Sequence, residues 1–124
     1  YDPNPAGAGG PTSPVGGVCN SDRSLKRHIA PITGSLEKLL RVQPVTFEEV
    51  EQPGVRQAGL IAQELEQVFP HLVVGQAGAK KIRYGLELQM HMLQAIKEQQ
   101  AIIEAQQERL EALEVKVAAE LQMD

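Results

Sequence analysis

Residues 86–122 read LELQMHMLQAIKEQQAIIEAQQERLEALEVKVAAELQ, and this stretch decides the architecture of the chain. It contains neither glycine nor proline and is dominated by alanine, leucine, isoleucine, glutamate and glutamine, most of which are good helix formers. At 1.5 Å per residue such a helix reaches roughly 55 Å, which is too far for the rest of a small chain to cover. We therefore expect one long helix that packs against copies of itself.

Apolar residues recur along this helix with the seven-residue period of a coiled coil. The predicted seam consists of Met92, Ile96, Ile103, Leu110, Leu113 and Val117, with the polar residues Gln99, Gln106 and Glu120 at the other d positions. Arg109 and Glu114 fall at g and e, the positions that meet between chains in a parallel coiled coil. The heptads alone do not decide between two and three strands.

The alternative is a solitary amphipathic helix that folds back on its own domain. It applies best to the first two turns, where Leu86, Met90 and Leu93 are expected to dock locally.

Composition narrows the class of protein. Aromatic residues make up only 3% of the 124, so any core is aliphatic and small, and the single cysteine, Cys19, excludes a disulfide within one chain. Residues 85–124 carry eight acidic and three basic residues, and an acidic helix argues against nucleic-acid binding.

No apolar run is long enough to cross a membrane, and no signal peptide is evident. Since Tyr1 is not a methionine, we expect a piece of a longer polypeptide.

Three regions follow from changes in character along the chain. Residues 1–20 are rich in proline and glycine and are predicted to form an extended arm. Residues 21–84 are predicted to form a compact α+β unit, and residues 85–124 the coiled-coil helix.

Within the central unit, helices and hairpins are predicted from periodicity and turn residues. Residues 35–42 and 62–69 have helical spacing, with Ser35 as the N-cap of the first and prolines after both. Residues 45–50 and 57–61 flank a Pro-Gly turn, and residues 72–74 and 81–84 flank a glycine-containing loop, which predicts two pairs of strands.

One motif has a pattern that carries chemistry: Asn20-Ser21-Asp22-Arg23-Ser24-Leu25-Lys26. A serine hydroxyl becomes a nucleophile when a base takes its proton, and lysine can be that base where its charged form is destabilised, as by the neighbouring Arg23 and Arg27. On this pattern alone, a helix N-cap with a charged first turn is the favoured explanation of the same residues. His28, His71 and His91 have no metal-ligand spacing with Cys19, so no metal site is predicted.

An ordered set of motifs resembles one known family. Ser-Asp-x-x-Leu-Lys-x-x-Ile at 21–29 is followed by Leu36–Leu40, Gln43-Pro-Val-Thr-Phe47, Gly59-Leu-Ile-Ala-Gln-Glu64, Val68-Phe-Pro70 and Val73-Val74, and then by the terminal helix. This order resembles the C-terminal intramolecular chaperone domain of phage tailspikes and fibres, typified by endosialidase tailspikes. The resemblance covers residues 20–124, and it makes residues 1–20 the end of an upstream fibre.

The resemblance implies a homotrimer that helps the upstream fibre to fold and then releases itself by cutting its own backbone between Asn20 and Ser21. By position, Ser21 would be the nucleophile, Lys26 the general base and Asp22 an orienting residue. Gln63 and Glu64 are candidates for support of the oxyanion or, equally, for structural hydrogen bonds. No cofactor, nucleic acid or membrane is implied, and the setting would be a virion tail fibre or the host cytoplasm during assembly.

Two alternatives stay open at this point. The same fold could act as a permanent trimerisation cap that does not cut itself, or the chain could be a generic coiled-coil adaptor whose partner helix is not its own copy.

Overall fold

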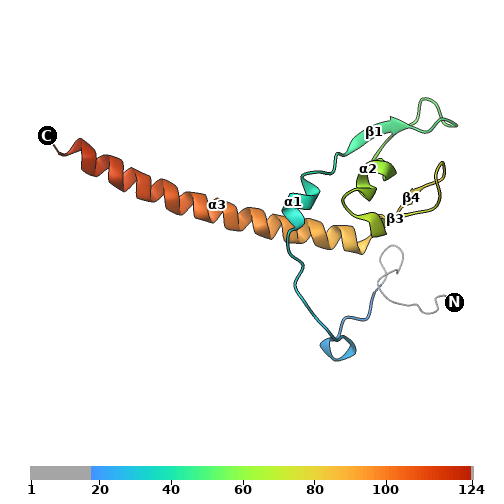
Figure 1. Ribbon diagram of the computed structural model, residues 1–124, viewed down its shortest axis with the longest axis horizontal. Coiled ribbons are helices and arrows are strands. Elements are labelled where there is room, and N and C mark those ends of the chain that lie inside the picture. The colour runs from blue at the N-terminus through green and yellow to red at the C-terminus, as the bar shows by residue number, and fades with distance from the viewer. Residues whose placement is uncertain (1–17, 124) are drawn as a thin grey trace.

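The computed structural model describes residues 18–123. These residues form a mixed α+β fold in which small antiparallel strand pairs and short helices surround the start of one long helix (Figure 1). The fold class predicted from the sequence is confirmed at this level. The predicted proline- and glycine-rich arm, residues 1–20, lies almost entirely outside the described part of the chain.

The long helix α3 runs from Leu86 to Leu121, 36 residues, as predicted. Its first turns lie against the short elements, and its distal half extends away from them (Figure 1). Every residue from 99 to 121 is exposed in the single chain. The contacts of α3 with its own chain are therefore confined to its N-terminal part.

Both predicted strand pairs are present, with shorter strands. β1 (Val45–Glu48) pairs antiparallel with β2 (Arg56–Gly59), and β3 (Val73–Val74) pairs with β4 (Lys81–Ile82). In the second hairpin Gly75 has φ +94, and a Cβ there would lie 2.7 Å from the carbonyl oxygen of Ala79. Glycine is thus required by the turn itself.

The core is small and aliphatic apart from one phenylalanine. Helix α2 (Ala62–Glu66) and the 3-10 turn Pro70–Leu72 supply its buried centre, which consists of Leu65, Phe69 and Leu72. Side chains from α1 (Ser35–Leu39), β3, β4, α3 and the connecting segments pack around it, namely Leu39, Val42, Leu60, Val68, Val73, Ile82 and Leu88. Helix α2 ends before the predicted Phe69, because a residue that precedes proline disfavours helical backbone.

The N-terminus of α1 is capped differently from the prediction. The N-cap residue is Gly34, which has a left-handed conformation at φ +73. Ser35, which was predicted to be the N-cap, is instead the first residue of the helix. The carboxylate of Glu98 on α3 accepts hydrogen bonds from the backbone N–H groups of Ser35 and Leu36, at 3.3 and 2.9 Å. Glu98 therefore caps the N-terminus of α1 in place of a local serine side chain, and it also fixes α1 to α3.

The predicted local docking of the first turns of α3 was wrong in its residues. The face of α3 turned toward the body, which we call the inner face, consists of Leu88, His91, Ala95 and Glu98. Leu86, Met90 and Leu93 remain exposed. The contacts of His91 and Glu98 with α1 set the rotation of α3 about its axis, and apolar periodicity alone does not reveal such polar contacts.

Candidate functional site

Ser21 and Lys26 lie together in a short turn. Asp22 is the N-cap of the 3-10 turn Arg23–Leu25, and Lys26 follows as its C-cap. This turn folds the chain back far enough for Lys26 Nζ to donate a hydrogen bond to Ser21 Oγ at 2.7 Å. The Asn20–Ser21 peptide bond immediately precedes the turn, so the hydroxyl belongs to the residue on the C-terminal side of the bond predicted to be cut.

Asp22 holds the turn rather than the dyad. Its Oδ1 accepts hydrogen bonds from the Ser24 hydroxyl at 2.6 Å and from the Ser24 backbone N–H at 2.8 Å. These two bonds, the hydroxyl one first, lower the pKa of the Asp22 carboxyl below its usual value. An ionised Asp22 therefore stabilises the conformation that brings Lys26 back to Ser21. Ser24 had no role in the sequence interpretation, although Asp-x-Ser is a common capping pattern.

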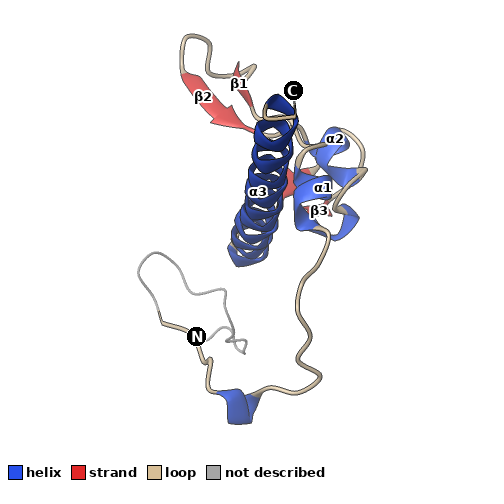
Figure 2. Cartoon of the chain, turned by 90° about the vertical axis from the view of Figure 1, so that its left-hand side faces the viewer, coloured by secondary structure: helices blue, strands red, loops and turns tan. Residues whose placement is uncertain are grey.

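The dyad is carried on an exposed strand of chain that leaves the body. Every residue from 18 to 34, the dyad segment, is exposed, whereas Ser35 is fully buried. Figure 2 shows that this segment extends away from α3 and from the helices α1 and α2. In a single chain both partners of the dyad are thus accessible to water.

Gln63 and Glu64 are not brought to the dyad within one chain. Both are exposed residues of α2, and Figures 1 and 2 place α2 apart from the 3-10 turn that follows Ser21. Support of an oxyanion by Gln63 remains a prediction.

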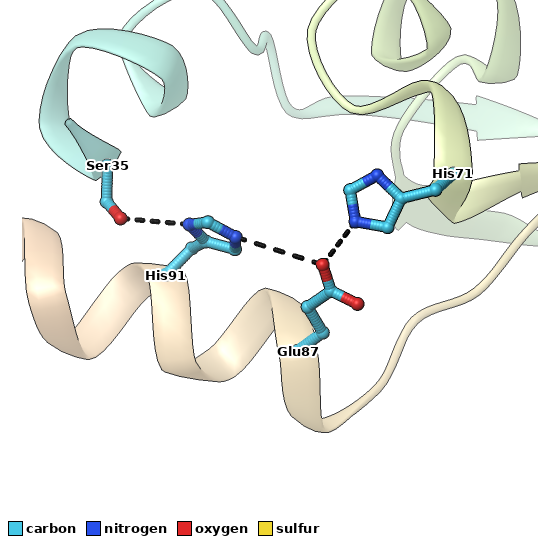
Figure 3. A network of polar contacts seen from close by, with 4 residues as sticks. All are labelled: Ser35, His71, Glu87 and His91. Carbon is cyan, nitrogen blue, oxygen red and sulfur yellow. Dashed lines mark hydrogen bonds and ion pairs between the residues drawn. The ribbon is translucent and has the colours of Figure 1, made fainter. Parts of the chain in front are cut away.

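A second serine also contacts a basic side chain, in the interior of the body (Figure 3). Ser35 Oγ lies 2.9 Å from His91 Nδ1, and His91 Nε2 lies 3.9 Å from a Glu87 carboxylate oxygen that also binds His71. These four residues join α1, α3 and the 3-10 turn Pro70–Leu72. Sequence analysis missed the network, because its histidines and its serine are far apart in the chain and share no local pattern.

This interior network resembles a catalytic triad only in composition. Ser35 is 0% exposed and His91 is 8% exposed, so neither the hydroxyl nor the imidazole can meet a substrate. The His91 ring also packs on the Phe69 ring, with centroids 4.8 Å apart. The network therefore anchors α1, and with it the root of the dyad segment, to α3.

The predicted seam is a row of exposed apolar side chains on α3. Its members, Met92, Ile96, Ile103, Leu110, Leu113 and Val117, are between 43% and 63% exposed. Within residues 18–123 no three His, Cys, Asp or Glu side chains are grouped as metal ligands. The helices of this same part of the chain include none that is long and apolar enough to cross a membrane.

Comparison with known proteins gives one family. The family model Peptidase_S74, chaperone of endosialidase, matches residues 21–74. Its name denotes a peptidase, and its description denotes a chaperone of endosialidase. No curated protein matches the chain. The match begins at Ser21 and spans the dyad, α1, the first hairpin, α2 and β3. The resemblance drawn from the ordered motifs is therefore confirmed: residues 21–74 are similar to the chaperone-of-endosialidase family.

Proposed function

We propose that the chain is a self-releasing intramolecular chaperone: it trimerises, guides the folding of an upstream fibre or tailspike segment, and cuts its own backbone once, between Asn20 and Ser21. A virion tail fibre under assembly is the setting that fits the family. The observation that carries the proposal is the 2.7 Å contact between Lys26 Nζ and Ser21 Oγ at the first residue of the family match.

The geometry supports a Ser–Lys mechanism. A neutral Lys26 amine takes the proton of the Ser21 hydroxyl, and the oxygen attacks the carbonyl carbon of Asn20. The tetrahedral intermediate collapses with loss of the Ser21 amide nitrogen, which gains a proton and becomes an amine. The product is an ester between the Asn20 carbonyl and Ser21 Oγ. Water then hydrolyses this ester and restores the hydroxyl, leaving a carboxylate on Asn20.

The two contact faces of α3 support self-association. With 3.6 residues per turn, the seam lies about 100° around the helix from the inner face. Met92 and Ile96 are therefore exposed at the same level at which His91 and Ala95 are buried against the body. Docking of the body and packing of the seam use different sides of one helix, so a coiled coil can form without displacing α1.

Because the dyad is exposed in a single chain, trimer assembly can control cleavage by burying it. A lysine ammonium can only donate to a hydroxyl, whereas a general base must be a neutral amine that accepts the hydroxyl proton. Removal of water from the dyad by a neighbouring chain would favour the neutral amine. Cleavage would then follow trimer formation.

The test is the intact mass of the chain under native and denaturing conditions. The native mass is expected to be that of a trimer, and the denatured mass to reveal a fragment of 104 residues that begins at Ser21. A trimer of uncut chains would instead indicate the permanent cap, and a chain that does not self-associate would indicate the adaptor.

Two substitutions separate enzymatic cleavage from the spontaneous chemistry of Asn-Ser bonds, in which the asparagine side chain attacks. Ser21→Ala is expected to abolish the fragment, because the nucleophile is lost, and Asn20→Ala to leave it. The reverse result would contradict the Ser–Lys mechanism.

Coupling of cleavage to assembly has its own test. Ile103→Asp combined with Leu110→Asp places charges in the seam and is expected to give monomers that do not cut themselves. Sedimentation reports the chain number and a denaturing gel reports the cut. Monomers that cleave at the parental rate would refute the coupling.

A further inference from the structure

Helix α3 carries a third apolar surface that neither the body nor the seam uses. Leu86, Met90 and Leu93, the proximal stripe, are between 38% and 52% exposed in the single chain. They lie on the flank of the seam opposite to the inner face, about 100° from the seam itself. Beyond Leu93 this flank becomes polar and acidic, with Gln100, Glu104, Gln107 and Glu111.

In a parallel coiled coil this flank faces a particular side of the neighbouring helix. Leu86 and Leu93 are at e positions, and e positions of one helix lie beside g positions of the next. The g positions at this level are Leu88 and Ala95, which belong to the inner face that carries the body. The proximal stripe of one chain is thus turned toward the body of its neighbour, and toward the point at which the neighbour's dyad segment emerges.

The dyad segment has apolar side chains that its own chain does not cover. Leu25, Ile29 and Ile32 are 66%, 55% and 36% exposed. The segment leaves the body at Ser35, beside the inner face, and turns toward the N-terminal end of α3 (Figure 1). The dyad segment and the N-terminal part of α3 therefore lie at similar levels along the helix axis.

We propose that the dyad segment of one copy docks on the proximal stripe of α3 of a second copy. The proposal rests on the parallel self-association put forward above and names the surface that completes the dyad. Charge agrees with this occupant: residues 21–33 carry three bases and one acid, a net charge of +2, whereas α3 carries seven acids and three bases, a net charge of −4.

The segment is long enough for the crossing. Thirteen Cα-to-Cα steps lead from Ser21 to Gly34 and span up to roughly 43 Å when extended, whereas packed helix axes lie about 8–10 Å apart. Each copy offers one segment and one stripe, so three copies close a ring in which every segment is held by the next chain. Leu25 lies within the turn that joins Ser21 to Lys26, and its burial on the neighbour removes water from the dyad.

Engineered disulfides test which chain holds the segment. In a Cys19→Ser, Ser21→Ala background, which keeps the chain whole and removes the native thiol, Leu93→Cys is combined in turn with Leu25→Cys, Ile29→Cys or Ile32→Cys. Under oxidising conditions at least one pair is expected to give a covalent trimer on a denaturing, non-reducing gel. Disulfide-closed monomers, or no disulfide from any pair, would overturn the docking.

Charge substitution on the stripe tests its effect on cleavage. Met90→Glu with Leu93→Glu is expected to leave the native mass that of a trimer, since the seam is intact, and to slow cleavage at least tenfold. The matched control is Val115→Glu, an exposed position on the distal part of the same helix that belongs neither to the seam nor to the stripe. Parental cleavage in a trimeric stripe variant would overturn this inference and leave the proposed function standing. Native masses that show monomers of the unsubstituted chain would refute both.

Discussion

Within the part of the chain that the structure describes, two serine hydroxyls contact a basic side chain, in opposite surroundings. Ser35 is fully buried, lies 2.9 Å from His91, and joins two helices that are far apart in the sequence. Ser21 is exposed, lies 2.7 Å from Lys26, and belongs to a turn of six residues outside the body. The buried pair has the more familiar catalytic composition, yet the exposed pair lies where the family match begins, at Ser21.

The difference shows that access and position decide the role of such a contact. A buried hydroxyl with a satisfied partner stabilises the fold, since leaving either group without its hydrogen bond is costly. An exposed hydroxyl next to a carbonyl carbon can react with it, once a base is in place. Substitutions in the two pairs should therefore have opposite consequences, one on rate and the other on stability.

The largest expected effect is on the base of the exposed pair. Lys26→Met is expected to slow self-cleavage by about 10²–10⁴-fold, the usual contribution of a general base, and to leave the thermal unfolding midpoint unchanged. Cleavage is followed on a denaturing gel over time. Arg41→Met, which removes an exposed basic side chain outside the dyad segment, serves as the control. Undiminished cleavage in Lys26→Met would exclude the dyad.

Substitutions in the buried pair, Ser35 and His91, should change the free energy of unfolding. Ser35→Ala leaves the His91 imidazole without its hydroxyl partner and is expected to lower the free energy of unfolding by about 1–3 kcal/mol. Denaturant titration measures this value. Adding His91→Phe removes the second polar group and is expected to recover part of the loss, because an apolar ring still packs on Phe69. A loss in Ser35→Ala of less than a few tenths would show that the contact is dispensable.

The smallest expected effect is the pH dependence of the α1–α3 contact. The backbone N–H of Leu36, followed by the side chain of Gln94, lowers the pKa of Glu98 below its ordinary value of 4.5. A carboxyl with a lowered pKa stabilises the folded state fully above its ordinary value, and this stabilisation is lost as the pH falls from 4.5 through the lowered pKa. The unfolding midpoint of Glu98→Gln is therefore expected to fall less on acidification. Glu108→Gln, an exposed substitution of the same kind on α3, should behave like the parent; equal acid sensitivity in all three would contradict the role of Glu98.

The long helix and both hairpins could be predicted because their signals are local. Thirty-six residues without glycine or proline specify a helix by propensity, and Pro53-Gly54 and Gly75–Gly78 mark the two turns. The contact between Ser21 and Lys26 was also within reach, since a spacing of five residues can be closed by one turn.

The packing of α1 could not be predicted, because it depends on residues about sixty positions apart. Glu98 replaces the expected cap at Ser35, and His91 accounts for the burial of the Ser35 hydroxyl. Neither residue has a sequence pattern that distinguishes it from an exposed polar residue of α3. The same two contacts explain why Leu86, Met90 and Leu93 were wrongly expected to dock on their own body.

The short turn between Ser21 and Lys26 has a consequence for the direction of the reaction. In the proposed reaction, the cut would make Ser21 the first residue of the released fragment, with a free α-amino group. A positive charge on that group and one on the Lys26 side chain would lie within the same six residues, and like charges repel each other. The repulsion opposes the contact that prepared the hydroxyl for attack. Repulsion within this turn would therefore disfavour re-formation of the Asn20–Ser21 bond and make the proposed cleavage one-directional.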